Sequence, residues 1–334
     1  MNTKIIVILL CVMLLTTGVV LAVPAPKDMI TRMKTNQVSP VSDVVPIWRV
    51  GDTWTYKIQN ISLNFEENNQ TINLILTIDQ LPLRVTSDSG DSYSLSFSTK
   101  GSGHGVIDVT TDQGPLNAEI NFQDATIQGS IVIEKTKLGI QSMDAKLHGT
   151  FHLTIIEFPG GQLPFSHLPI PVTMNVTLGF SNPVAVLSFP MDTGTIWNLS
   201  ASDLTVNGDI HSIWLNIIHF VNMIMGIFGN NFLPPEIDAL LPNVNIKDAL
   251  TTFGLPNVFS TPEIPGLFAC GNKTTVTVTA GTFDAYNISI AEGIGTIYYA
   301  PTAGNVIKIS GNFHDIIPYI QDLNMELSST TYQP

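Results

Sequence analysis

Hydrophobic and polar residues alternate along most of this chain. The clearest run is 116–157, where Ile127 and Ile131 share one side of an extended chain and Gln128 and Ser130 share the other. Alternation with a period of two is typical of strands that have one buried and one solvated face, as in antiparallel sheets. Segments on both sides of this run, such as SYSLSFST and VTVTAGTF, repeat the pattern. The chain is therefore predicted to be mainly β, with antiparallel strands.

One segment departs from this alternation. Residues 213–228, IWLNIIHFVNMIMGIF, are almost entirely apolar, and the few polar residues in and beside them recur with the period of an α-helix. The pattern predicts a helix with one polar stripe on an otherwise apolar surface. The residues of the stripe are Ser212, Asn216, His219, Asn222 and Gly226.

Three interpretations of this helix are open. It packs on the sheet as part of the core, it lines a hydrophobic groove for a lipid-like ligand, or it lies on a membrane surface. A transmembrane span requires about 20 apolar residues, whereas this segment is shorter and is interrupted by polar side chains. In a groove, the ligand-binding residues would be Trp214, Ile217, Ile218, Phe220, Val221, Ile224 and Phe228, with His219 at the polar margin.

The helix belongs to a longer insertion at 208–262. Within it, LPPEIDALLP and NIKDALTTFG predict two more short helices, which proline and glycine bound. Alternating strands precede and follow the insertion. Residues 47–334 are therefore predicted to be a single β-rich domain with a helical insertion.

The N-terminus has the composition of an export signal. Lys4 precedes a continuous apolar run that ends in small residues at Ala22, as in a secretory signal peptide. The run is also about long enough to be a retained membrane anchor. Residues 1–22 are predicted to be a signal peptide, and the Pro-, Ser- and Val-rich residues 23–46 a flexible tether. Both alternatives place the protein outside the cytoplasm, either secreted or at the cell surface.

The charge of the chain argues against two classes of binding partner. The formal net charge is −13, from 14 basic and 27 acidic residues, and loss of Lys4 with the leader makes it one unit more negative. Nucleic acids and anionic lipids both require a basic surface, so this excess of acidic residues argues against them.

Without the leader only one cysteine remains, Cys270, so stability must come from a hydrophobic core rather than a disulfide. Cys270 itself is expected to be a buried apolar residue rather than a nucleophile.

Sequons for N-glycosylation recur after the leader. In an exported protein such triplets are acceptors for surface glycans. A chain rich in Asn, Ser and Thr also contains them by chance, so both interpretations stand. The candidate acceptors are Asn60, Asn69, Asn175, Asn198, Asn272 and Asn287.

Two motifs resemble a pattern in exported cell-envelope proteins of unknown function. The opening VGDTWTYKI at 50–58 matches its start, and the segments from VTVTAGTF through GTIYYAPTAGNVIKI to MELSSTTY, within 276–332, match its end. The resemblance implies a curved antiparallel sheet similar to the half-barrels of bacterial lipoprotein carriers, which hold acyl chains against a helix. The motifs contain no reactive side chain, so no functional residue is carried over. The predicted fold is therefore mainly β: a large curved antiparallel sheet, half-barrel or open sandwich, with a helical insertion on its concave face.

The sequence contains no motif for catalysis or for a cofactor. A nucleophile elbow, a zinc-protease motif, a phosphate-binding loop and a dinucleotide fingerprint are all absent from it. His148 and His152 share a face of the predicted strand but lie about 13 Å apart, too far to bind one metal ion. Asp88 and Asp91 flank a predicted hairpin turn without the ligand spacing of a calcium loop. We therefore predict no enzymatic activity, metal ion or cofactor.

These features predict a non-enzymatic envelope protein outside the cytoplasm and close to the membrane. Its expected partner is a lipid or another hydrophobic small molecule, bound in a groove between sheet and helix. A glycosylated structural or adhesion module of the cell surface is the alternative, and an envelope hydrolase without a recognisable motif is a second one. An open apolar groove would favour the ligand carrier, and a filled one the structural module.

Overall fold

The computed structural model describes most of the chain after residue 43. The described residues are mainly β-strand, and the longest helix among them is α2, Ile213–Ile227. The predicted signal peptide 1–22 and most of the predicted tether lie outside the described residues, so both stay predictions. The described ranges are 44–67, 70–111, 114–157, 167–227, 243–248, 258–291, 293–313 and 320–334.

The strands fall into a long N-terminal set and a shorter C-terminal set. The first set is β1 (Thr53–Glu67), β2 (Gln70–Ser89), β3 (Ser92–Thr111), β4 (Gly114–Glu134), β5 (Ile140–Glu157) and β6 (His167–Val184). Four short or intermediate strands follow: β7 (Ile196–Leu199), β8 (Ser202–His211), β9 (Asn243–Asn245) and β10 (Val258–Thr261). The last set is β11 (Ile264–Val278), β12 (Gly281–Ile290), β13 (Gly295–Ala300), β14 (Asn305–Asn312) and β15 (Ile320–Thr330).

All fifteen strands form one antiparallel sheet. Its order is β10-β8-β6-β5-β4-β3-β2-β1-β15-β14-β13-β12-β11-β7, with β9 beside β8. Thus β1 to β6 lie side by side in chain order, and β15 returns from the C-terminus to pair with β1. The path ends at β10 and β7, so the sheet is open. These findings confirm the prediction of a mainly β fold built on one large antiparallel sheet.

One face of the long strands is apolar because their side chains alternate in register. On β5, Leu147 and Phe151 are buried while His148 between them is exposed. Leu147 lies directly between Ile127 of β4 and Met174 of β6, and both of these are buried too. The period of two read from the sequence therefore becomes an apolar face and a polar face that extend across neighbouring strands.

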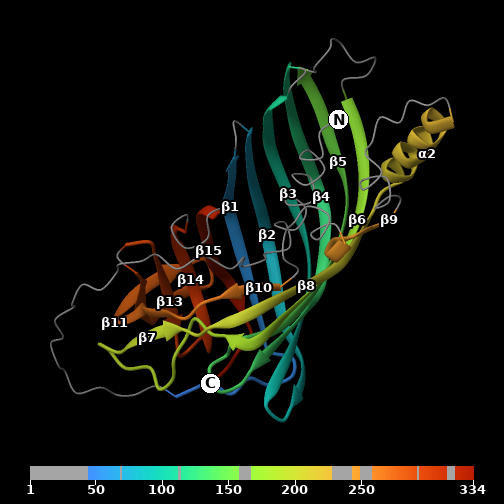
Figure 1. Ribbon diagram of the computed structural model, residues 1–334. Helices are drawn as coiled ribbons and strands as arrows, with labels where there is room; N and C mark the ends of the chain where they lie inside the picture. Colours follow the sequence, from blue (N-terminus) through green and yellow to red (C-terminus); the bar gives the residue numbers. More distant parts are fainter. Residues whose placement is uncertain are drawn as a thin grey trace.

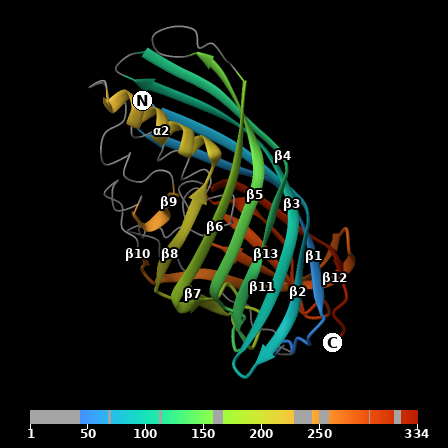
Figure 2. The same cartoon turned by 90° about the vertical axis from the view of Figure 1, so that its right-hand side faces the viewer.

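The sheet bends toward its apolar face. Leu95 and Phe97 share one side of β3, but Phe97 joins the apolar cluster of the long strands, whereas Leu95 packs with Ala285 and Leu327 of the C-terminal strands. The C-terminal strands therefore fold over one end of β1–β4, and the apolar face is the concave one. Figures 1 and 2 show the long strands β2–β6 as a curved wall that extends away from this packed end. The other side of β11–β14 is covered by the segment that contains Met191.

Hydrogen bonds from two tryptophans join the two ends of the chain. The indole nitrogen of Trp54 donates to the carbonyl oxygen of Ala303 at 2.6 Å, and that of Trp48 donates to Gly304 at 2.9 Å. Gly304 adopts a left-handed conformation, φ 62°, and a Cβ there would overlap with the ring of Tyr332. The VGDTW start and the YYAPTAG turn, far apart in sequence, are therefore in direct contact.

The predicted helical insertion is present on the concave side but is small. The helix expected at 213–228 is confirmed as α2, and its Leu215 packs against the apolar face. Much of the remaining 208–262 is strand, because β8 continues to His211 and both β9 and β10 pair with β8. Ile246–Asp248 are helical, where the second short helix was expected. The first of the two short helices, at 233–242, lies outside the described residues.

Candidate ligand-binding site

The apolar side chains on the concave face of β1–β6 and β8 form one continuous cluster, and its members are at most 8% exposed. Among the described residues, only Ile246 and Leu215 add to this cluster from outside the strands, so within that part of the chain no second β-layer covers it. Apolar sheet faces are normally paired with another layer of secondary structure. The buried members are Leu63, Leu74, Leu76, Phe97, Ile107, Ala118, Ile120, Phe122, Ala125, Ile127, Ala145, Leu147, Phe151, Val172, Met174, Val176, Leu178, Leu204, Val206, Ile210, Val244 and Ile246.

Part of this surface stays accessible beside α2. Four half-buried apolar side chains pack against the cluster there: Leu153 and Ile155 of β5, Ile170 of β6 and Leu215 of α2. We refer to these four residues as the apolar strip. Leu153 and Ile170 occupy neighbouring positions of adjacent strands, because Leu153 pairs with Leu168 and Ile170 with Phe151. The strip is therefore a partly exposed border of the apolar cluster.

Helix α2 is attached to the sheet near its first turn. The indole nitrogen of Trp214 donates to the carbonyl oxygen of Pro169 on β6 at 2.7 Å, and Leu215 packs into the apolar cluster. Trp214 and His219 are both half-buried. Of the predicted ligand-binding residues, Trp214 therefore lies on the side of the helix that faces the sheet, and His219 lies at the margin of that side.

The opposite side of α2 is an exposed apolar ridge. Ile213, Ile217, Phe220 and Met223 recur at helical spacing, and their side chains are 41–59% exposed. Ile217 and Phe220, which were expected to line a groove, therefore lie on the side of the helix that faces away from the sheet. The reason is that Trp214 and Leu215 fix the rotation of the helix through one hydrogen bond and one packing contact. The side chains of Ile218, Val221 and Ile224, and the whole of Phe228, lie outside the described part.

The convex face of the long strands is polar and contains a trough. The trough is open, has a volume of about 870 Å³ and is lined by residues of β1–β6. Its central side chains are short serines, and longer side chains flank them. The pairings place Arg84, Ser96, Ser130, Asp144 and Thr177 in one row across β2–β6. This trough was not predicted from the sequence, because the two cations that line it lie on β2 and β5, and only the strand register brings them to the same depression.

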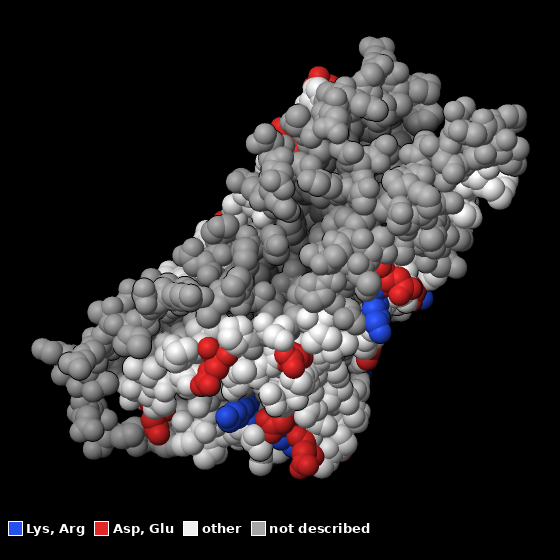
Figure 3. Space-filling model, viewed as in Figure 1, with Lys and Arg blue, Asp and Glu red and all other residues white. Residues whose placement is uncertain are grey.

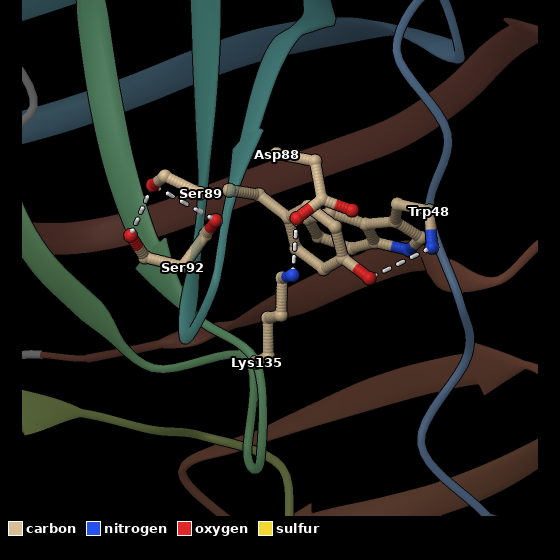
Figure 4. Close-up of polar contacts among 6 residues, drawn as sticks. Trp48, Asp88, Ser89, Ser92 and Lys135 are labelled. Atoms are coloured by element: carbon tan, nitrogen blue, oxygen red, sulfur yellow. Dashed lines mark hydrogen bonds and ion pairs between the residues drawn. The ribbon is translucent and has the colours of Figure 1, made fainter.

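The hairpin between β2 and β3 contains the two acids considered as calcium ligands. Asp88 forms an ion pair with Lys135 (Figure 4). The Lys135 ammonium also lies 4.7 Å from the centre of the Tyr93 ring. The Tyr93 hydroxyl accepts a hydrogen bond from the backbone nitrogen of Trp48 at 3.1 Å. The predicted turn is confirmed, with Gly90 at φ 53°. Asp88 therefore contributes to a structural contact network near the N-terminal tryptophans.

The histidines on the convex face each have a different neighbour. His104 contacts Asn121 at 2.7 Å, His148 contacts the Thr173 hydroxyl at 2.8 Å, and His211 contacts the carboxylate of an aspartate on its own strand. Across the described ranges, no group of three or more histidines, cysteines or acids is arranged to hold a metal ion.

The sequons differ in accessibility. Asn272 on β11 and Asn198 on β7 are both exposed, and the Asn198 amide donates to Glu263 and accepts from the Gly266 nitrogen. Asn287 is half-buried on β12, and Asn175 is half-buried on β6 within the trough. The side chains of Asn60 and Asn69 are outside the described part of the chain.

Cys270 lies in the core of the C-terminal strands. Burial raises the pKa of its thiol to about 12, and the negative charge of Asp192 adds to this effect. A thiol that stays protonated at neutral pH is a poor nucleophile. The geometry therefore supports the structural interpretation of Cys270.

Charged side chains are sparse on the described surface. In Figure 3 the acidic and basic side chains on one face lie scattered rather than in one patch. None of the described helices has both the length and the hydrophobicity needed to span a bilayer.

The sequence and the structure match no protein-family model, no curated protein and no solved structure.

Proposed function

We propose that this protein is a non-enzymatic envelope protein that binds a lipid-like molecule on the concave face of its sheet. The observation that carries the proposal is the apolar cluster on the concave face of β1–β6 and β8, which has the partly exposed apolar strip at its border and no second β-layer over it within the described residues. Binding sites for small apolar ligands are concave and lined mainly by hydrophobic side chains with a few polar groups at the margin.

The apolar strip supports a specific location for the ligand. Leu153, Ile155 and Ile170 pack against the cluster but remain half-exposed, and Leu215 lies on the same surface. An acyl chain lying along this strip would replace water on the exposed parts of these side chains. Removal of apolar area from water contributes about 25 cal/mol per Å². Half-buried His219 at the margin would meet the polar end of the ligand.

The exposed ridge of α2 supports a position close to a membrane. Its four apolar side chains lie on a helix that has no acidic residue in its first turn and no basic residue in its last. An uncharged apolar surface fits the interface of a bilayer, where apolar side chains enter the boundary between head groups and acyl chains. The resemblance to envelope proteins with carrier-like half-barrels agrees with this proposal.

The test combines extraction of bound lipid with titration of a probe. The purified protein is extracted with chloroform and methanol, and the extract is analysed by mass spectrometry. The protein is then titrated with dansyl-undecanoic acid. We expect a co-purified lipid and saturable binding of the probe.

Two adjacent residues of β5 provide a matched pair of variants. Leu153→Gln places an amide on the concave face and is expected to weaken probe binding about fivefold to tenfold, whereas His152→Gln alters the convex face and leaves it unchanged. Thermal unfolding of both variants checks that they are folded. Absence of co-purified lipid together with absence of saturable binding in the parent would contradict the proposal and favour the surface module.

A further inference from the structure

The trough on the convex face has a shape set by side-chain length. Ser96 of β3 and Ser130 of β4 occupy its floor, and they pair with each other across the two strands. Arg84 of β2 lies beyond Ser96, and Lys146 of β5 lies on the other side. Short side chains between two long ones leave a depression on an otherwise flat sheet face.

The trough is lined by two basic side chains, Arg84 and Lys146, and one acidic side chain, Asp144, so its lining carries one net positive charge. Arg84 and Lys146 are exposed, and neither forms an ion pair with a described residue. The carboxylate of Asp144 accepts a hydrogen bond from the Thr177 hydroxyl at 2.6 Å. In a chain with 14 basic residues and a net charge of −13, two such cations in one depression are a local exception. They favour an anionic ligand.

The other polar side chains that line the trough are neutral and can both donate and accept hydrogen bonds. Ser98 and Gln128 are exposed and pair with each other beside the serines of the floor. Hydroxyl and amide groups of this kind match the hydroxyl groups of a sugar, which also donate and accept. Nucleic acid is a poorer match because its binding requires a broad basic surface.

A sequon lies inside the trough. Asn175 lines it, and its amide nitrogen donates to a carboxylate oxygen of Asp209 at 2.9 Å. Thr177, the third residue of the same sequon, also lines the trough. A glycan attached to Asn175 would therefore begin within the depression. The same surface is open to a free oligosaccharide when Asn175 carries no glycan.

We propose that this trough binds an acidic oligosaccharide, with Arg84 and Lys146 holding its carboxylate or sulfate groups and the serine and amide side chains contacting its hydroxyl groups. Arginine can bind a carboxylate through two parallel hydrogen bonds, and lysine acts as a point charge. The trough lies on the face opposite the apolar strip, so this site does not depend on the proposed lipid-like ligand.

The test measures binding of defined hexasaccharides to the purified protein by calorimetry at low ionic strength. The probes are a galacturonic acid hexamer, a heparin-derived hexasaccharide and the neutral maltohexaose. We expect at least one acidic probe to bind more tightly than the neutral one, with an affinity that falls as salt is added. Arg84→Gln and Lys146→Gln should each weaken it about tenfold.

Lys100→Gln is the matched control. Lys100 is exposed on the same face but lies outside the lining of the trough and pairs with Asp124. Its substitution should leave the affinity unchanged within about twofold. An equal loss of affinity in Lys100→Gln and in Lys146→Gln would show that the attraction is not specific to the trough and would overturn the proposal. Binding of maltohexaose as tight as that of the acidic probes would overturn it as well.

Mass spectrometry of the peptide that contains Asn175 distinguishes the two sources of the sugar. If the residue is unmodified, the parent protein should bind a free acidic hexasaccharide, and failure to bind any of the probes overturns the proposal. If it carries a glycan, the trough is occupied, and Asn175→Gln should gain binding of an acidic hexasaccharide. Failure of that variant to bind any of the probes would equally overturn the proposal.

Discussion

Replacement of Trp54 by phenylalanine is expected to destabilise the protein by about 2–4 kcal/mol. Trp54 is fully buried, and its ring lies 4.7 Å from that of Trp48. Its indole nitrogen donates to the carbonyl oxygen of Ala303 at 2.6 Å. The substitution keeps an aromatic ring at the contact between the two ends of the chain but removes the indole N–H that donates to Ala303.

The expected loss has two parts. The carbonyl oxygen of Ala303 is left without the indole partner in a buried environment, which costs about 1–3 kcal/mol. The smaller ring leaves a space next to Trp48 and Tyr332, which adds about 1 kcal/mol. The contact joins residues that are 249 positions apart, so its loss weakens the packing of the C-terminal strands on the N-terminal ones.

Urea unfolding followed by far-ultraviolet circular dichroism measures this loss without depending on tryptophan fluorescence. Trp214→Phe is the control, because its indole nitrogen also donates to a backbone carbonyl, at 2.7 Å, but the residue is only half-buried on α2. The control should lose only about 0.5–1.5 kcal/mol. Similar losses in both variants, or a loss below about 1 kcal/mol for Trp54→Phe, would refute the argument that this contact holds the two ends together.

Four further outcomes are expected. The Cys270 thiol should not react with iodoacetamide in the folded protein at pH 8 but should react in urea, because burial raises its pKa to about 12. Because this folded pKa exceeds the unfolded value, its contribution to stability is complete below about pH 9 and is lost as pH rises toward 12, so urea midpoints should fall over that range. Gly129→Ala should cost about 2–4 kcal/mol because a Cβ there would overlap with the carbonyl oxygen of Asp144, whereas Gly179→Ala, with open space around it, should change stability by less than about 1 kcal/mol. Melting curves with and without a chelator should coincide, and a drop of several degrees would reveal a metal site.

The candidate site was only partly predictable from the sequence. The helical period of 213–228 identified α2, but the exposed position of Phe220 and the half-buried position of His219 depend on how Trp214 and Leu215 meet the sheet. Periodicity gives the relative angles of side chains on a helix but not the rotation of that helix against its neighbour. The trough on the convex face could not be predicted from periodicity either, because residues of six different strands line it.

The sequence by itself determined that the chain is mainly β, that its strands have one apolar and one polar face, and that α2 interrupts them. These properties follow from the local alternation of side chains, which each strand expresses without reference to the others. The tertiary structure decided which strands pair, that the sheet bends toward its apolar face, and that Trp54 meets Ala303. The physical reason is that register and curvature arise from contacts between residues distant in sequence, whereas a hydrophobic pattern records only which side of a strand is to be buried.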